Sequence, residues 1–493
     1  MSERMTKGTP ERPTDRTPER ASDRTPERAS DRTPERASDR TPERLSARAA
    51  ERLSARAAIA TVTNDFTELP VPARDFPMDG PLAWEGYGAA RDRATERTGE
   101  EESVIAGLAE VAGRPCVLIS FEFGFLGGSL GLRTGDRLEA AYATARERRL
   151  PLVSLIATGG SRMQEGMLAL AQLQRVARQS ALLREAGLAQ IAVLRDPTTG
   201  GGWATLGAGA DVVLALPGAQ IGFAGSRVRP ADADPAAYRA EGQLAAGQID
   251  AIVRRQDLRG VLAGWLTLLG GAHPGEPGPA PVPAPFDHPG LPSDGWEAVS
   301  RARAADRPRA EAYLDAYFPH RQALVGDRCG GVDPGMLCGF GLHAGASYAY
   351  AAQTGTATRP AGYRAAARLI RLADRLGIPV LTLIDTPGAA NDAAAEREGQ
   401  GAAIADAFAA VASARVPVTT LVIGEGGSGG ALALTSPDRM WVTADSYFSV
   451  IAPEPAAAIL KRPASEARRT ASQLRLRPQD LVELGVARGV LGA

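Results

Sequence analysis

Short runs of Leu, Ile and Val alternate along most of the chain with longer segments rich in Ala, Leu and Arg. One apolar run, residues 150–156, ends in a glycine turn and precedes a helical pattern over residues 163–185. A similar run, residues 378–384, ends in a Thr-Pro-Gly turn and precedes a helical pattern over residues 402–414. Continuous apolar strands that alternate with amphipathic helices are typical of buried parallel sheets. The pattern therefore predicts an α/β fold.

The two apolar runs are related by an offset along the chain that other features share. Leu150 and Ile378, which begin the two runs, are as far apart in the sequence as Gly201 and Gly429, which begin two glycine pairs. We therefore expect two tandem domains of one fold, packed together, over residues 67–270 and 297–493. Residues 271–296 between them are rich in Pro and Gly, which is typical of a linker.

The N-terminal segment follows a different pattern, an octapeptide repeat that begins near residue 9. The unit Thr-Pro-Glu-Arg-Ala-Ser-Asp-Arg recurs and then drifts, so that the last two units lose proline and gain Leu45 and Leu53. The early units lack apolar residues and therefore have no means of building a core. We predict a disordered tail over residues 1–66, with a short helix possible in its last units; a partner-docking segment is the alternative.

Charge and cysteine content narrow the class of protein. The net charge is −1, which favours neither nucleic acid nor a membrane surface as a partner. Cys116, Cys329 and Cys338 form no CxxC pair, so the pattern indicates neither a disulfide framework nor a zinc site. We find no apolar run long enough to span a membrane and no signal peptide pattern. The prediction is a cytoplasmic protein without a metal.

Two common motifs overlap on the glycines that follow residues 416–423. Residues 424–429 fit the dinucleotide-binding pattern GxGxxG, but that pattern opens a βαβ unit, whereas here it follows a later strand. Residues 426–430 fit the GxSxG pattern of serine hydrolases, but no histidine follows His343 in the chain. Both interpretations are therefore disfavoured.

Histidine is scarce, and none lies near a glycine turn. A histidine base or a histidine metal site is therefore not expected. Glycine pairs between a strand and a helix leave backbone N–H groups without partners at the positive end of the helix dipole, where they stabilise a developing oxyanion. Gly159-Gly160 and Gly429-Gly430 are such pairs. Either pair alone is most simply interpreted as a tight turn. Because related turns recur at one offset, we favour a role for both in stabilising an oxyanion.

Longer runs resemble a known family, the carboxyltransferase of bacterial acetyl-CoA carboxylase. The first half resembles its β subunit in residues 121–131, 158–166, 196–201, 221–228 and 249–255. The second half resembles its α subunit in residues 362–364, 384–389, 423–431 and 449–454. The chain departs from the family in lacking a four-cysteine zinc ribbon, a Tyr-Pro-Gly stretch after Ala389 and a His-Gln-Lys-Gly segment near Gln353.

The resemblance implies two crotonase-type ββα spiral domains that move a carboxyl group from carboxybiotin to an acyl-CoA. Gly159 and Gly160 would hold the thioester oxygen, and Gly429 and Gly430 would hold the ureido oxygen of biotin. The further candidates for binding CoA phosphates or biotin are Arg162, Arg227, Arg254, Arg255, Gly388 and Gly427.

The resemblance also implies partners. The chain has no GxxxxGK[ST] loop, and Lys7 and Lys461 lie outside a biotinylation motif, so biotin carboxylase and the biotin carboxyl carrier protein are expected on other chains. A homodimer or higher homo-oligomer is expected, with each site built between two chains; a site formed by the two halves of one chain is the alternative that the linker allows. The alternatives are a malonyl-thioester decarboxylase of the same fold and a non-catalytic scaffold that binds CoA or the carboxylase partner.

Overall fold

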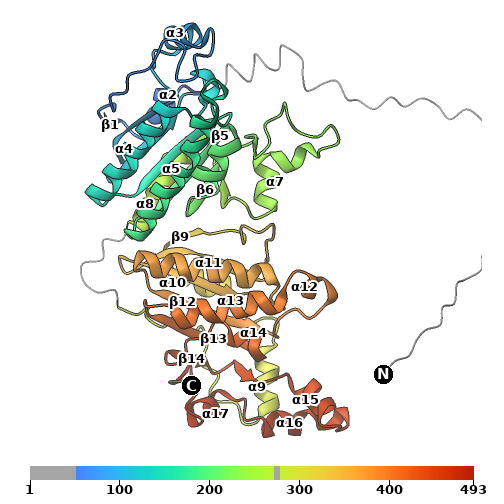
Figure 1. Cartoon of the computed structure of the whole chain (residues 1–493). Helices are drawn as coiled ribbons and strands as arrows, with labels where there is room; N and C mark the ends of the chain where they lie inside the picture. Colours follow the sequence, from blue (N-terminus) through green and yellow to red (C-terminus); the bar gives the residue numbers. More distant parts are fainter. Residues whose placement is uncertain (1–51, 271–277) are drawn as a thin grey trace, which may run out of the picture. The chain divides into compact units, whose positions relative to one another are not determined.

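The computed structural model describes residues 52–270 and 278–493 (Figure 1). Most of the predicted tail, residues 1–51, and residues 271–277 of the predicted linker lie outside the described residues. Leu53–Ala493 forms one compact unit that contains two sheets. No helix in the described ranges is long and apolar enough to cross a membrane.

The first half is built on a mixed sheet with the strand order β1-β2-β3-β4-β5-β6-β8, and β7 pairs with β5. The first three strands are antiparallel, and the strands from β3 onward are parallel. The strands are β1 (Asp65–Glu68), β2 (Val104–Val111), β3 (Arg114–Phe121), β4 (Leu152–Thr158), β5 (Gln190–Thr199), β6 (Val212–Ala215), β7 (Ile221–Gly222) and β8 (Ala251–Ile252).

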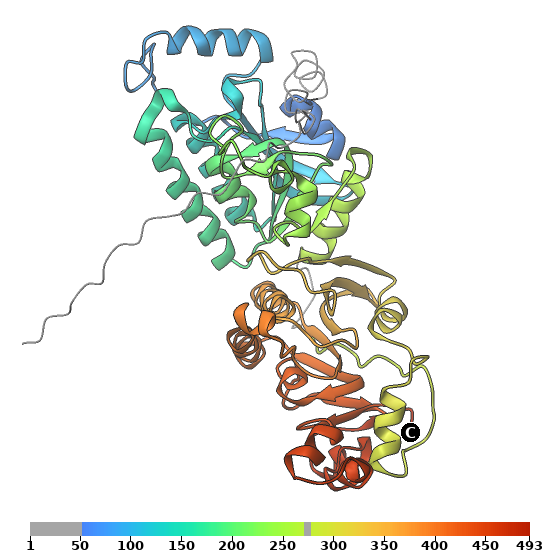
Figure 2. The same ribbon diagram turned by 90° about the vertical axis from the view of Figure 1, so that its right-hand side faces the viewer.

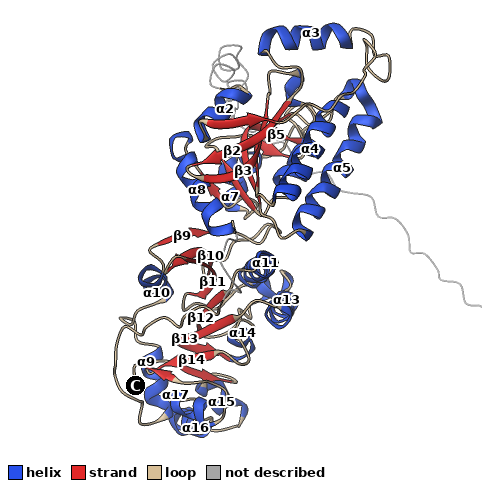
Figure 3. Cartoon of the chain, turned by 90° about the vertical axis from the view of Figure 1, so that its left-hand side faces the viewer, coloured by secondary structure: helices blue, strands red, loops and turns tan. Residues whose placement is uncertain are grey.

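Helices cover both faces of this sheet (Figure 3). Alternate residues of β3 enter different clusters, Leu118 with the α2 and α8 side and Ile119 with the α4 side, so both faces are buried. The helices are α2 (Ala55–Val62), α3 (Tyr87–Thr98), α4 (Leu132–Arg148), α5 (Gly166–Glu185), α6 (Gly200–Gly202), α7 (Ala240–Ala245) and α8 (Leu258–Leu269). Single short turns lie at η2 (Leu126–Gly128), η3 (Met163–Glu165), η4 (Trp203–Gly207), η5 (Pro235–Tyr238) and η6 (Arg255–Asp257).

The second half repeats this topology in the order β9-β10-β11-β12-β13-β14-β16, and β15 pairs with β13. The strands are β9 (His320–Ala323), β10 (Met336–His343), β11 (Ala346–Gln353), β12 (Val380–Thr386), β13 (Val418–Gly427), β14 (Met440–Thr443), β15 (Tyr447–Ser449) and β16 (Val490–Leu491). The helices are α9 (Gly295–Ala302), α10 (Ala310–Tyr317), α11 (Pro360–Leu376), α12 (Ala393–Arg397), α13 (Gln400–Ser413), α14 (Ser428–Leu432), α15 (Pro453–Ile459), α16 (Ala467–Gln473) and α17 (Pro478–Glu483), with a short turn η7 (Ala464–Glu466).

One constant sequence offset relates the central strands of the two sheets. It superimposes β4 on β12, β5 on β13 and β6 on β14 at both ends of each strand. The register also shifts at the same place in both sheets, between Ile156 and Thr158 and between Ile384 and Thr386. The predicted α/β fold with tandem domains of one architecture is therefore confirmed.

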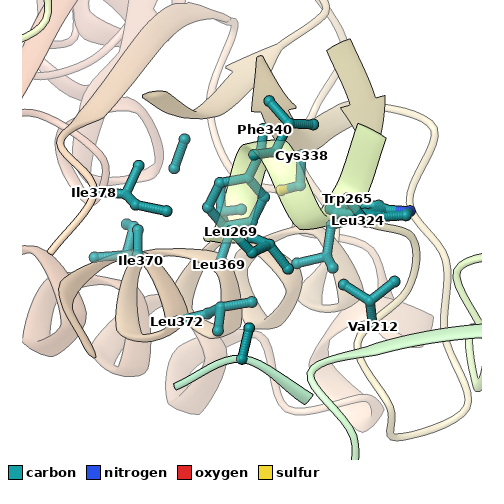
Figure 4. Close-up of a cluster of buried hydrophobic side chains, with 14 of the residues drawn as sticks. Val212, Trp265, Leu269, Leu324, Cys338, Phe340, Leu369, Ile370, Leu372 and Ile378 are labelled. Atoms are coloured by element: carbon teal, nitrogen blue, oxygen red, sulfur yellow. The ribbon is translucent and has the colours of Figure 1, made fainter. Parts of the chain in front are cut away.

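Buried apolar side chains from both halves of the chain, whose ribbon Figure 2 shows in a second view, form one cluster (Figure 4). Trp265 of α8 lies edge-on to Phe340 of β10, with ring centroids 6.3 Å apart. Asp250, which is buried, receives ion pairs from Arg328 and Arg368 of the second half. The two halves therefore share a core rather than only a linker.

The predicted tail extends too far, because residues 55–66 are folded. Ser54 caps α2 by accepting a hydrogen bond from the Ala57 N–H, and Ala55, Ile59 and Val62 are buried. The Ala55 N–H donates to Glu122 Oε2 at 2.7 Å. The proline-free last repeat unit thus becomes a helix because it presents an apolar face to the sheet. The predicted linker, residues 271–296, also extends slightly too far, since α9 begins at Gly295.

Candidate active site

The first predicted glycine turn lies at the carboxyl end of β4. Gly160 has φ +109°, a conformation that favours glycine. A Cβ atom on Gly160 would lie 3.6 Å from Gly200 Cα and 3.9 Å from the Gly201 nitrogen. The turn therefore packs directly against the start of α6, which follows the neighbouring strand β5.

The N–H groups of the predicted pair already have acceptors within the chain. Gly159 N–H donates to the Gly127 carbonyl at 2.8 Å, and Gly160 N–H donates to Thr158 Oγ1 at 3.1 Å. Gly200 N–H donates to the Phe223 carbonyl at 3.1 Å. Gly201 and Gly202 occupy the first turn of α6, where N–H groups have no intrahelical acceptor.

Gly201 and Gly202 therefore offer N–H groups that the sequence analysis did not include among its candidates, although their offset from Gly429-Gly430 was visible in the sequence. The turn at Gly159-Gly160 forms the wall opposite them.

The second glycine turn is built in the same way at the carboxyl ends of β12 and β13. Gly388 has φ +139° and donates its N–H to Thr386 Oγ1 at 3.1 Å, as Gly160 does to Thr158. A Cβ atom on Gly427 would lie 2.1 Å from the Pro387 carbonyl oxygen, and one on Gly430 would lie 2.4 Å from the Ala389 nitrogen. The structure thus brings the predicted residues Gly388, Gly427 and Gly430 together.

Gly429 differs from its neighbours because it faces open space. A Cβ atom on Gly429 would have no heavy atom within 4 Å. Ser428, Gly429 and Gly430 form the first turn of α14, so their N–H groups have no intrahelical acceptor. The turn can therefore donate hydrogen bonds to an oxygen atom that approaches Gly429.

A buried ionic network supports the first turn, and Arg162 is its centre. Arg162 is 1% exposed, and its Nη1 donates to Glu102 Oε2 at 3.0 Å and to Glu165 Oε1 at 3.4 Å. Burial alone lowers the pKa of Arg162, but the neighbouring carboxylates outweigh it and hold this pKa above its ordinary value. The prediction that Arg162 binds a CoA phosphate is therefore wrong, because both its charge and its donors are used inside the protein.

The other three predicted arginines remain exposed. Arg227 lies in the loop that begins at Phe223, whose carbonyl holds Gly200, so this loop borders the first glycine turn. Arg254 lines a cavity of about 550 Å³ between β8, α8 and β9, and no residue of either glycine turn is among its lining residues. Arg255 is exposed beside it. The phosphate-binding roles of Arg227, Arg254 and Arg255 stay predictions.

The second turn has a separate support. Asp385, which is fully buried, accepts from Arg307 Nη2 at 2.5 Å and from Arg309 Nη1 at 3.1 Å. The Gly430 carbonyl accepts from Gln353 Nε2 at 3.2 Å and from the Tyr363 hydroxyl at 3.0 Å. Burial raises the pKa of Tyr363, so this hydroxyl stays protonated and remains a donor. None of these supports was predicted, because their residues are scattered along the chain.

The arrangement offers backbone donors at two repeated turns. Among the residues that the structure describes, no group of three His, Cys, Asp or Glu side chains could hold a metal ion. Backbone N–H groups in such turns are suited to stabilising negative charge that develops on an oxygen atom during a reaction.

Family comparisons agree with this division into halves. Residues 84–253 match the carboxyl transferase domain, and residues 293–492 match the acetyl co-enzyme A carboxylase carboxyltransferase-like family. The acetyl-coenzyme A carboxylase carboxyl transferase subunits beta/alpha of Salinispora arenicola are 40% identical over 449 residues, covering 86% of this chain and 79% of the relative. The protein of the same name from Clostridium tetani is 35% identical, covering 81% and 72%.

Solved structures share the fold. Transcarboxylase 12S, with methylmalonyl-coenzyme A and methylmalonic acid bound, superposes with a TM-score of 0.71 at 19% identity, covering 91% of this chain and 88% of that chain. A single-chain, multi-domain long-chain acyl-CoA carboxylase gives a TM-score of 0.69 at 20% identity, covering 92% of this chain and 46% of that chain.

Proposed function

Because this chain belongs to the family of acetyl-CoA carboxylase carboxyl transferases with fused beta and alpha halves, we propose that its two glycine turns form the two halves of one carboxyl-transfer site. The family reaction moves a carboxyl group from carboxybiotin to an acyl-CoA. The observation that carries the proposal is the repetition of one turn geometry, with Gly160 and Gly388 each donating to the threonine two residues before it.

The first turn accepts the thioester end of the acyl-CoA. When the α-carbon loses its proton, negative charge develops on the thioester oxygen, and the Gly201 and Gly202 N–H groups opposite Gly160 stabilise it. The N–C bond of carboxybiotin breaks with its electron pair left on the ureido nitrogen, and this nitrogen takes up the α-proton. The α-carbon then bonds to the released carbon dioxide, so no side-chain base is required.

The second turn accepts the ureido group of biotin. Gly429 is open to an incoming oxygen atom, and the N–H groups of the first turn of α14 are the donors. Gln353 and Tyr363 hold the Gly430 carbonyl from behind, so the peptide planes of this turn keep their orientation as charge develops. Gly388 and Gly427 contribute close backbone packing rather than side-chain contacts.

Two copies of the chain together complete the site. Large apolar side chains beside both turns are exposed in the single chain: Met163 and Phe223 are 76% and 73% exposed near the first turn, and Val450 is 72% exposed after β15, which pairs with Gly427. Exposed apolar groups around a polar site favour burial against a partner surface. A two-fold operator would place the first turn of one chain against the second turn of another.

The test is a reconstituted reaction. The chain, biotin carboxylase, biotinylated carrier, ATP and bicarbonate are combined with acetyl-, propionyl- and longer acyl-CoAs, and carboxylated product is measured. We expect product only when all components are present. ATP-dependent carboxylation by the chain alone would refute the assignment of the partners, and malonyl-CoA decarboxylation without biotin would favour a decarboxylase. CoA binding without either reaction would indicate a scaffold.

A further inference from the structure

Two arginines share one aromatic ring on the segment beside the first glycine turn. The guanidinium carbons of Arg91 and Arg133 each lie 5.0 Å from the centroid of the Phe76 ring. Arg91 also lies 5.7 Å from the Tyr87 ring, and the Phe76 and Tyr87 rings meet edge to face at 6.3 Å. Because each guanidinium carbon lies 5.0 Å from the same centroid, the two carbons are at most 10 Å apart, a span that one ligand with several phosphate groups can bridge.

Neither guanidinium group is neutralised by a carboxylate within the described part of the chain. Arg133 donates from Nη2 to the Arg74 carbonyl at 3.1 Å, and among the described residues no ion pair involves Arg91 or Arg133. Burial and the charge of Arg91 lower the pKa of Arg133, and the opposing effects of Glu102 and Glu101 are too small to restore it to its ordinary value. Two unpaired positive charges that repel each other are stabilised by an anion between them.

The position of this pair relates it to the proposed site. Tyr87, one helical turn before Arg91, donates to Glu165 Oε1 at 2.5 Å, and the other oxygen of Glu165 accepts from the Leu132 N–H, directly before Arg133. The Leu130 N–H donates to the Gly160 carbonyl at 2.9 Å. Three Cα–Cα steps separate Leu130 from Arg133, so these Cα atoms are at most about 11 Å apart.

We propose that Arg91 and Arg133, held by Phe76, bind the phosphate groups at the nucleotide end of CoA, an inference that rests on the proposed function of the first turn. Arginine suits this role because its planar fork of donors matches phosphate oxygens. The aromatic rings fix the guanidinium groups and leave their edges free to donate. Phosphates at Arg133 leave the pantetheine arm to span the remaining distance to Gly160 and Gly201.

The experiment uses the full chain and three probes: CoA, adenosine 3′,5′-bisphosphate and acetyl-pantetheine, which lacks the nucleotide. Arg91→Gln and Arg133→Gln are compared with Arg93→Gln, an exposed arginine on the same helix. Affinities for CoA and the bisphosphate are measured by calorimetry, and the KM for acetyl-pantetheine is measured in the reconstituted reaction. Thermal unfolding of each variant is recorded.

We expect each of the first two variants to weaken CoA and the bisphosphate about tenfold or more, because a charge-assisted contact is lost. Acetyl-pantetheine should keep its KM within about twofold, and Arg93→Gln should bind all probes as the unaltered chain does. Arg91→Lys and Arg133→Lys serve if a glutamine variant unfolds; they keep the charge but lose the fork, and should weaken CoA less.

Two results would overturn the proposal: unchanged affinity for CoA and the bisphosphate in both variants, or an equal loss for CoA and acetyl-pantetheine, which would indicate that the arginines only hold the segment in place. The outcomes separate the two proposals. If the unaltered chain binds the bisphosphate through these arginines but transfers no carboxyl group, the proposed function fails alone. If it transfers the group and the variants bind CoA normally, only the phosphate site fails.

Discussion

The substitution Gly429→Ala tests the role of the second turn without disturbing the fold. At Gly429 an added methyl group meets no heavy atom within 4 Å, and the backbone does not have a positive φ, so alanine is accommodated without strain. At Gly430 the same methyl group would lie 2.4 Å from the Ala389 nitrogen, 2.7 Å from the Tyr363 hydroxyl oxygen and 2.9 Å from the Gly388 carbonyl carbon. Only the first substitution therefore fills the site without forcing the backbone to move.

The two substitutions are expected to differ in stability but not in activity. Gly429→Ala should change the free energy of unfolding by no more than about 1 kcal/mol, in the stabilising direction, because alanine is the better helix former. Gly430→Ala should cost about 1–3 kcal/mol, since it overpacks a backbone contact. Both should lower turnover, by about 10²-fold or more if the methyl group keeps the ureido oxygen from one donor.

The assay is carboxyl transfer from carboxybiotin on the carrier, measured beside chemical unfolding of each variant. Gly401→Ala is the matched control, because Gly401 is also a helical glycine whose added methyl group meets nothing within 4 Å. The control should keep its activity and change the free energy of unfolding by no more than about 1 kcal/mol, as Gly429→Ala does. If Gly429→Ala unfolds like the unaltered chain and its turnover stays within about threefold, the second turn does not hold the reacting group and the assignment is refuted.

Three further outcomes are expected. Arg162→Met should lower the free energy of unfolding by about 3–5 kcal/mol, because it leaves buried carboxylates without a partner; a loss below about 1 kcal/mol in urea unfolding would show that the network relaxes easily. Deleting residues 1–51 should leave activity and thermal stability unchanged, whereas deleting residues 1–62 should destabilise the chain markedly, since it removes the buried face of α2; equal melting temperatures for the two truncations would contradict this. Mixing Gly160→Val and Gly429→Val chains under exchange conditions should restore part of the activity, because a mixed dimer holds one unaltered pair of turns; no recovery, or a monomer by sedimentation, would show that each site lies within one chain.

Much of the fold follows from patterns that are local in the sequence. Strands β4 and β12 are runs of apolar residues that end in a glycine turn, and the constant offset between them already implied two domains of one fold. Gly429 and Gly430 were predicted for a similar reason, because they form a glycine pair between a strand and a helix, whereas Gly388 and Gly427 came from the family resemblance.

Tail length was harder to predict, because helix α2 differs from the preceding repeat units by only a few residues. Its stability comes from the sheet it covers, including the Glu122 carboxylate that accepts from the Ala55 N–H. Helices as short as this one have little stability in isolation. The boundary near residue 52 therefore depends on a contact with a residue far along the chain.

Residue type and spacing along short stretches were enough to establish the α/β class, the duplication and the two glycine turns. Which groups those turns offer, and what surrounds them, depended on contacts between segments that are far apart in the sequence. Those contacts placed Gly201 and Gly202 opposite Gly160, buried Arg162 between two carboxylates, and brought Arg91 and Arg133 to one phenylalanine ring. An arginine in the sequence is equally suited to a phosphate and to a carboxylate. Only the packing of distant segments settles which partner it meets.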